Sequence, residues 1–243
     1  MSDIKKINRQ FLIALLSFIG IVILLVVGDL LAYLLIENAN ITYPIYLSTL
    51  LGLLFLTAHY QNTLDQITNM SYLIKIRANE AKPLNILNLK SIDAAGAVFR
   101  KNGYECFFSD NTYSLYYRID YDHIKKIFRN YILTIFIVLK NKNAEFYLER
   151  VDTEVNKLRD QQFKAKKRVT HLIISQIKEI DTLDDHTKEA IKEIVFIRTK
   201  RFLISTINIG LHRSSQQAVM LYSDTYSPSL YYKYQIEEIK KII

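Results

Sequence analysis

A long apolar run near the start of the chain constrains its fold more than any other feature. Residues 11–36 hold a single charged side chain, that of Asp29. At about 1.5 Å per residue, a helix over this run is longer than the roughly 30 Å hydrocarbon core of a bilayer. A cleaved signal peptide would have a shorter apolar region, of about 7–15 residues, and a cleavage site of small residues. The run therefore predicts a transmembrane helix.

A second span is predicted directly after the first. Residues 44–60 contain no Asp, Glu, Lys or Arg, and Pro44 at their start is tolerated in a first helical turn. The connecting residues 37–43 also lack Lys and Arg, which makes them the expected external loop. Basic residues instead flank the pair: Lys5, Lys6 and Arg9 within the N-terminal residues 1–10, and Lys75, Arg77 and Lys82 after it. The positive-inside rule then predicts a two-pass membrane protein with both termini in the cytoplasm.

Asp29 is the one costly residue in this anchor. A carboxylate at mid-bilayer costs about 2.5–3.5 kcal/mol on insertion scales, but the many Leu, Ile, Val and Phe residues of the same run outweigh it. Small residues four positions apart on both spans favour close packing, with Asp29 near Ser48 or Thr49. Asp29 could serve as a proton or ion path in an oligomer of hairpins, or as a hydrogen-bonded packing residue. Two spans alone enclose no pore, which favours packing.

The rest of the chain has the pattern of an α/β domain. Residues 61–90 are expected to form an amphipathic juxtamembrane segment, with apolar residues at helical spacing up to Pro83. In residues 91–243, strand-like and helix-like segments alternate, which predicts a cytoplasmic α/β domain with a mostly parallel sheet. The first helix is expected over 91–102, and the apolar run 132–139 is expected to be a central strand.

The charge is concentrated in this domain. Of the 32 basic and 24 acidic residues, three of each precede residue 61, so the net charge of +8 belongs to the remainder. Such a domain suits contact with anionic lipid or an anionic ligand. The densest basic cluster is interpreted as a solvated helix end or, alternatively, as a contact for lipid headgroups, and the lack of interleaved aromatic residues disfavours nucleic acid. Its members are Lys164, Lys166, Lys167 and Arg168.

Cys106 is the single cysteine of the chain. One cysteine excludes an intrachain disulfide and any multi-cysteine zinc site, and it suits a reducing compartment. Because cysteine is among the most buried residue types, we expect Cys106 to be a small core residue rather than a reactive thiol.

An internal repeat lies in the domain. Residues 109–128 and 223–243 are similar, and the two copies align without a gap for fourteen residues from Leu115 and Leu230. Leu, Tyr, Tyr, Ile, Lys, Lys and Ile are identical in that block. We therefore expect the same unit twice: a strand, a Ser-Asp turn, and a helix that starts near Ser227 in the second copy and near Ser114 in the first.

The turns of the repeat are the candidate ligand site. Ligands of open α/β sheets bind beyond the carboxyl ends of the strands, where helix N-termini offer unpaired amide protons. Both turns would lie at that edge, as two related pockets or as two halves of one that holds a small anionic ligand or a protein partner. The alternative is that these residues only form turns and helix caps. The residues are Ser109, Asp110, Thr112, Tyr113, Ser114, Ser223, Asp224, Thr225, Tyr226 and Ser227.

Motifs of catalysis are weak. The chain has no glycine-rich phosphate loop, no His-Glu-x-x-His and no Gly-x-Ser-x-Gly, and its five histidines lack metal-ligand spacing, so we expect no metal and no cofactor. Gly103 after a helix, nearby acids and the Gln-Ile-Lys of residues 176–178 resemble the restriction-endonuclease-like nuclease layout in outline only, because the strand before that triplet lacks the metal-binding acid.

The sequence is compatible with three functions. The first is a non-enzymatic, membrane-anchored sensor or adaptor that binds a ligand or partner in the cytoplasm. The second is an oligomeric membrane effector, in which a small anionic ligand changes the permeability of homo-oligomeric hairpins. The third is a membrane-tethered nuclease or hydrolase, in which Asp110 and Lys178 would act together.

Overall fold

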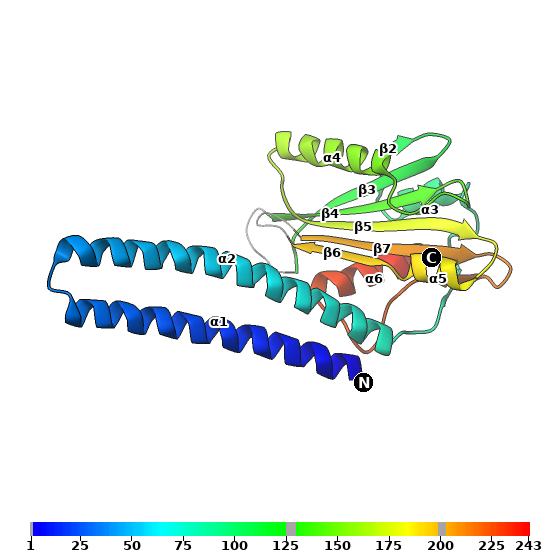
Figure 1. The fold of residues 1–243 in the computed structure, drawn as a ribbon. Helices are drawn as coiled ribbons and strands as arrows, with labels where there is room; N and C mark the ends of the chain where they lie inside the picture. Colours follow the sequence, from blue (N-terminus) through cyan, green and yellow to red (C-terminus); the bar gives the residue numbers. More distant parts are fainter. Residues whose placement is uncertain (1, 125–129, 199–202) are drawn as a thin grey trace. The chain divides into compact units, whose positions relative to one another are not determined.

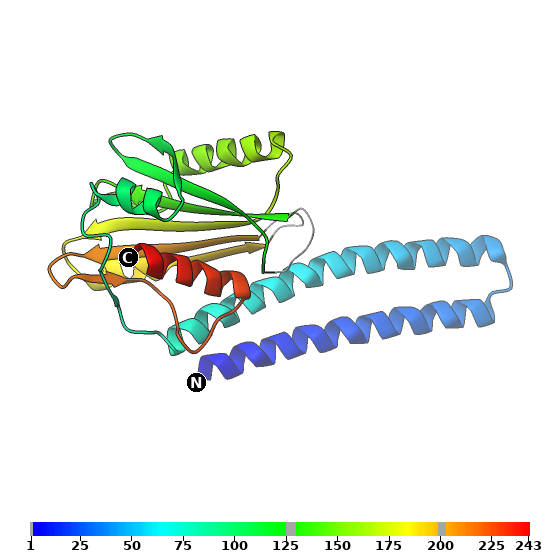
Figure 2. The same ribbon diagram turned by 180° about the vertical axis from the view of Figure 1, so that it is seen from behind.

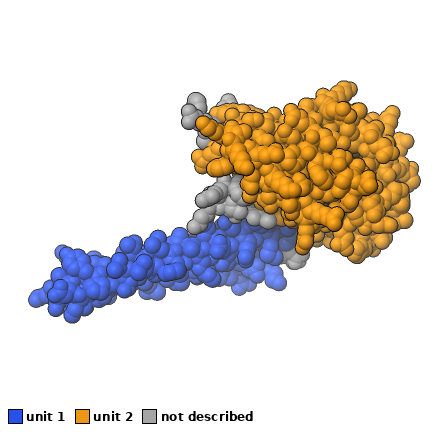
Figure 3. Space-filling model, turned by 90° about the horizontal axis from the view of Figure 1, so that it is seen from above, with its two compact units in different colours: residues 1–75 blue, residues 76–243 orange. Residues whose placement is uncertain are grey.

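The chain divides into two compact units, residues 1–75 and 76–243 (Figure 3). They are seen in a computed structural model that describes residues 2–124, 130–198 and 203–243. The first unit is helical, whereas the second contains a sheet with helices on both of its faces (Figure 1).

Two antiparallel helices make up the first unit. They are α1, Ser2–Leu35, and α2, Ala39–Ala78, and both are long and apolar enough to cross a membrane. α2 begins five residues before Pro44, which therefore lies beyond the first turn. It continues without interruption to Ala78, so it forms only the first part of the segment 61–90 that was predicted to be amphipathic. The predicted contact of Asp29 is present, since the Thr49 hydroxyl donates to its Oδ1 at 2.9 Å. Near the other end of the hairpin, the hydroxyls of Ser17 and Tyr60 lie 2.7 Å apart.

The described residues of the second unit form an eight-stranded sheet. Its order is β1-β8-β7-β5-β4-β3-β2, and β6 pairs with β7 on the same side as β8. The strands are β1 (Leu84–Asn85), β2 (Glu105–Ser109), β3 (Tyr113–Tyr121), β4 (Asn130–Leu139), β5 (Arg168–Ile180), β6 (Ile194–Arg198), β7 (Leu203–His212) and β8 (Gln217–Val219).

The sheet is mixed, which corrects the prediction of a mostly parallel one. β4, β5 and β7 are parallel to one another, whereas every other pairing is antiparallel. The connections explain the difference, because a short turn can only join antiparallel neighbours, while a parallel pair needs a crossover of a dozen or more residues. The helix between β4 and β5 provides such a crossover. The apolar run 132–139 is central, as predicted, with β3 and β5 on its two sides.

Helices cover both faces of the sheet (Figures 1 and 2). α4 (Glu149–Lys164) and α5 (Asp185–Ile191) lie on one face, and α3 (Ala95–Lys101) and α6 (Leu230–Ile242) lie on the other. On the α4 face, Leu133, Ile135 and Ile174 pack against Val155 and Leu158. On the α6 face, Ile132 and Ile173 pack against Tyr231, and the polar side chains of Ser205, Gln235 and Glu238 are buried as well.

Local capping residues set several helix ends. Asp184 caps α5 by accepting a hydrogen bond from the Thr187 amide at 2.9 Å. Gly103 follows α3 with a φ of +78°, the left-handed conformation that glycine adopts most readily. α3 is shorter than predicted, since the Ser91 hydroxyl bonds to the Asp93 amide in a turn and the helix starts only at Ala95.

The two copies of the repeat have different secondary structures. Leu-Tyr-Tyr lies in β3 in the first copy and begins α6 in the second, so the expected strand-turn-helix unit does not recur. Tertiary pairing explains the first copy, because β3 is hydrogen-bonded to β4 from Tyr113 to Tyr121. In the second copy Ser229, not Ser227, caps the helix and accepts the Tyr232 amide at 3.0 Å. Residues 125–128 of the first copy lie outside the described residues.

Candidate functional site

The two Ser-Asp turns lie toward opposite edges of the sheet. The first joins β2 to β3, whereas the second follows β8, and the strands β7, β5 and β4 lie between β8 and β3. The two halves of the proposed bipartite site therefore do not converge. Each turn is a separate structure.

The polar side chains of the first turn bond within its hairpin, and Lys140 also donates to the Ser109 hydroxyl. Asp110 Oδ1 accepts the backbone amides of Thr112 at 2.7 Å and Tyr113 at 2.8 Å, and these bonds, led by that from Tyr113, hold the pKa of the carboxyl below its ordinary value. The hydroxyls of Ser109 and Ser114 lie 2.8 Å apart across the same turn. The arrangement is that of a turn motif, in which the polar side chains satisfy nearby backbone groups.

The second turn lines a pocket. The cavity has a volume of about 290 Å³ and lies between residues 223–227 and α6. All five sequence-predicted residues of this copy contribute to it. Its lining is Ser223, Asp224, Thr225, Tyr226, Ser227, Tyr232, Lys233, Ile236, Glu237 and Lys240.

Two serines shape the loop that forms one wall of this pocket. Ser223 Oγ accepts the amides of Thr225 at 3.3 Å and Tyr226 at 3.1 Å, and Ser227 Oγ donates to the Ser229 carbonyl at 2.8 Å. The serines therefore hold the loop in its bend. This leaves the wall's other side chains, together with those of α6, to contact a bound molecule.

The charges of the pocket are balanced and accessible. Lys240 Nζ lies 2.9 Å from Asp224 Oδ1, and the two side chains are 41% and 61% exposed. Such an exposed pair contributes little to stability, so an incoming anion can replace Asp224 at little cost. Lys233 and Glu237, from the preceding turns of α6, also line the pocket. The site can thus offer two lysines and several hydroxyls to a small polar molecule.

The chain matches no known protein family. No curated protein and no solved structure matches it either. Its function has to be inferred from its own residues.

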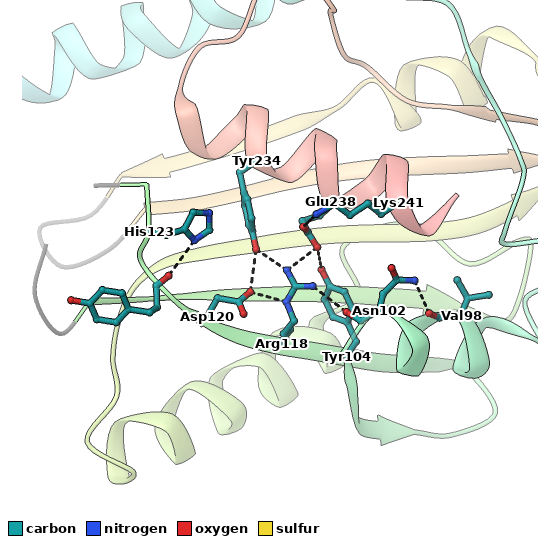
Figure 4. Close-up of polar contacts among 10 residues, drawn as sticks. Val98, Asn102, Tyr104, Arg118, Asp120, His123, Tyr234, Glu238 and Lys241 are labelled. Atoms are coloured by element: carbon teal, nitrogen blue, oxygen red, sulfur yellow. Dashed lines mark hydrogen bonds and ion pairs between the residues drawn. The ribbon is translucent and has the colours of Figure 1, made fainter. Parts of the chain in front are cut away.

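A buried ion-pair network lies beneath α6, and no pattern in the sequence predicted it (Figure 4). Arg118 of β3 donates to Glu238 Oε2 at 2.8 Å and to Asp120 Oδ2 at 2.7 Å. The Tyr104 hydroxyl donates to the same Glu238 oxygen at 2.7 Å, and Lys241 donates to Oε1 at 2.6 Å. Tyr104 and Arg118 lie more than a hundred residues from Glu238 in the chain, so no local spacing indicates that they meet.

The network holds Glu238 as a carboxylate. Burial raises the pKa of Glu238, but hydrogen bonds from Lys241 and Tyr104 and the charge of Arg118 outweigh it, so the pKa lies below its ordinary value. Burial is also the main cause that raises the pKa of Tyr234 to about 12. The groups satisfy one another, which assigns this network to docking α6 on the sheet rather than to binding a ligand.

A second buried group supports the start of the same helix. The Tyr231 hydroxyl donates to Asp122 Oδ2 at 2.7 Å, and its ring stacks on that of His171 with centroids 3.6 Å apart. Asp122 is fully buried. One wall of the pocket is therefore a helix that is fixed at both ends.

The residues of the nuclease interpretation are occupied elsewhere. Lys178 Nζ donates to the Ala144 carbonyl at 2.8 Å and lies 4.5 Å from the Phe146 ring centroid, and its burial lowers its pKa. The Asp110 carboxylate bonds to the amides of its own turn. Among residues 2–124, 130–198 and 203–243, no three His, Cys, Asp or Glu residues are grouped to hold a metal. The geometry thus lends this interpretation no support.

Cys106 is exposed, which corrects the expectation of a buried core residue. It lies on β2, the edge strand of the sheet, where one side of the strand has no neighbour in the described sheet. A general preference of cysteine for burial does not reveal that its strand is at an edge.

Proposed function

We propose that this chain is a membrane-anchored, non-enzymatic module that binds a small anionic ligand in the pocket between residues 223–227 and α6. The observation that carries the proposal is the lining of that pocket, which combines the hydroxyls of one loop with Lys233 and Lys240 of one helix. Its volume is near the lower end of the range for ligand sites, about 300–1,000 Å³, which suits a small molecule.

Electrostatics favours an anion as the ligand. Residues 61–243 carry the whole net charge of +8, so the domain attracts anions at long range. At short range, a phosphate or carboxylate of the ligand would replace the exposed Asp224 as the ion-pair partner of Lys240. Lys233, which lies one turn from Glu237, provides a second cation.

Binding can be tested by thermal unfolding of the full chain in detergent, with pyrophosphate and nucleoside 5′-monophosphates as probes. A ligand at ten times its Kd stabilises the folded state by about 1.4 kcal/mol, which raises the Tm of a domain of this size by roughly 3–6 °C. Lys233→Glu should abolish the shift. Lys101→Glu, the same charge change at an exposed lysine of α3, is the matched control and should retain it.

The sign of the ligand charge can be tested at Asp224. Asp224→Asn removes the carboxylate that competes for Lys240, so it should tighten anion binding. If none of the probes raises the Tm, or if Lys233→Glu retains the full shift, the proposed site is wrong.

The anchor is the other half of the proposal. α1 and α2 are long and apolar enough to span a bilayer, and the basic residues flank them on one side. Cys106 allows a direct test, because it is exposed and is the single cysteine of the chain. In sealed vesicles, a membrane-impermeant maleimide should label it from the cytoplasmic side alone, and the chain should resist carbonate extraction. Labelling from the opposite side would contradict the orientation.

A further inference from the structure

The end of α4 presents an unusual surface. Phe163 lies in the last turn and is 79% exposed, although the opposite side of the helix is buried in the apolar core. Lys164 and Lys166 beside it are exposed, as is Arg168 at the start of β5, whereas Lys167 is half-buried. We refer to these five residues, Phe163, Lys164, Lys166, Lys167 and Arg168, as the α4-end surface.

Backbone hydrogen bonds hold this surface in shape. The Lys166 amide donates to the Phe163 carbonyl at 2.9 Å, and the Lys167 amide donates to the Gln162 carbonyl at 3.0 Å. This pair of bonds is the Schellman motif, in which the residue after the helix is left-handed and is usually glycine. Here that residue is Lys166, with a φ of 59°. The motif therefore presents a lysine in a conformation that lysine seldom adopts.

The cations of the surface are not neutralised by nearby acids. Among the described residues, the ion pairs of this unit involve none of the four. The acid closest in sequence, Asp160, lies one turn earlier, with Arg159 Nη2 at 3.9 Å. A positive surface with an exposed aromatic ring beside it remains.

This combination matches the interface of an anionic bilayer. Basic side chains are attracted to anionic headgroups, while an aromatic side chain enters the boundary between headgroups and acyl chains. We propose that the α4-end surface docks on the anionic leaflet of the membrane that holds α1 and α2. The inference rests on the membrane anchoring proposed above, because tethering keeps the domain at high effective concentration near the bilayer and makes a weak contact sufficient. Each basic side chain close to such a leaflet favours contact by a factor of about five.

The chain offers a clean reporter of docking because it contains no tryptophan. Phe163→Trp places one fluorophore in the proposed contact. Leu87→Trp is the matched control, since Leu87 is similarly exposed, at 71%. It follows β1, the edge strand that β8 and β7 separate from β5 and the α4-end surface. Both full-length variants are reconstituted in vesicles of phosphatidylcholine alone or with one third phosphatidylserine, with and without brominated acyl chains.

Docking predicts that the brominated lipid quenches tryptophan at position 163 at least twofold more in the anionic vesicles than in the neutral ones. Quenching at position 87 should be equal in both. Adding Lys164→Glu and Lys166→Glu to Phe163→Trp, or raising the salt to 1 M, should remove the difference, because the attraction is electrostatic and is screened.

Three outcomes would overturn the proposal. Position 163 could show equal quenching in both lipids, or the double charge reversal could leave the quenching unchanged. Single-stranded RNA added to neutral vesicles could shift the emission of position 163 more than the anionic lipid does, which would assign the surface to nucleic acid. Flotation after carbonate treatment separates these results from a failed anchor, since a chain that is not embedded leaves the vesicle fraction.

Discussion

Glu238→Gln is the sharpest test of how α6 is held on the sheet. The Glu238 side chain is 2% exposed and accepts hydrogen bonds from Tyr104, Arg118 and Lys241. Glutamine preserves the volume of the side chain but removes its charge. Its NH₂ group cannot accept a hydrogen bond, although it takes the place of a carboxylate oxygen that accepts from a donor. A hydrogen bond to a charged group contributes about 1.5–3 kcal/mol and a neutral one about 0.5–1.5. Losing about 1 kcal/mol in each of three bonds lowers the free energy of unfolding by about 3 kcal/mol.

This magnitude agrees with an independent expectation. Removing one partner of a buried ion pair costs about 3–5 kcal/mol, and the lower end applies here because Arg118 is partly exposed and keeps Asp120 as a partner. The assay is urea unfolding of the full chain in detergent, followed by the near-ultraviolet circular dichroism of its tyrosines. Glu237→Gln, at the neighbouring position that lines the pocket, is the control and should change the free energy by less than about 0.5 kcal/mol.

The pH dependence gives the same test a second readout. Because the folded-state pKa of Glu238 lies below its ordinary value of 4.5, its contribution is complete above that pH and is lost as the pH falls through the folded value. The difference between wild type and Glu238→Gln should therefore shrink as the pH falls below 4.5. The reasoning is refuted if Glu238→Gln matches Glu237→Gln in stability, or if the difference does not change with pH.

Other residues give further tests. Ser229→Ala should destabilise the domain by about 1 kcal/mol because it removes the cap of α6, whereas Ser227→Ala should change urea stability by less than half as much. Tyr104→Phe should lower the free energy of unfolding by about 1.5–3 kcal/mol, since it removes a donor to a buried carboxylate, and an unchanged urea midpoint would contradict this. Asp29→Leu should leave the conductance of reconstituted vesicles unchanged if Asp29 only packs against Thr49, and a lost or gained ion current would show otherwise.

Contiguous patterns in the sequence predicted a good part of this fold. The apolar runs predicted both long helices and the central strand β4. The contact of Asp29 with Thr49 was also predictable, because a short loop aligns two helices at known depth. In these cases the deciding information lies close together in the chain.

Other parts depend on distant residues. Leu-Tyr-Tyr is a strand in one copy and a helix in the other because β4 supplies hydrogen bonds to the first, while Ser229 caps the second. The pairing of Arg118 with Glu238 joins positions 120 residues apart, so no spacing rule reveals it. Both turns of the repeat were predicted to be part of a site. The second lines a pocket, but the first is a hairpin turn toward the opposite edge of the sheet.

The position of α6 in the chain has a consequence for synthesis on the ribosome. The strands and α4 precede α6 in the sequence, so they emerge before the helix that covers the second face of the sheet. Until α6 emerges, Arg118 lacks Glu238 as a partner, and Ile132 and Ile173 lack the cover of Tyr231. A nascent chain stopped before Leu230 is therefore expected to be digested by protease faster than the full chain, because apolar residues of its sheet stay uncovered. The second face of the sheet can be closed only after α6 has left the ribosome.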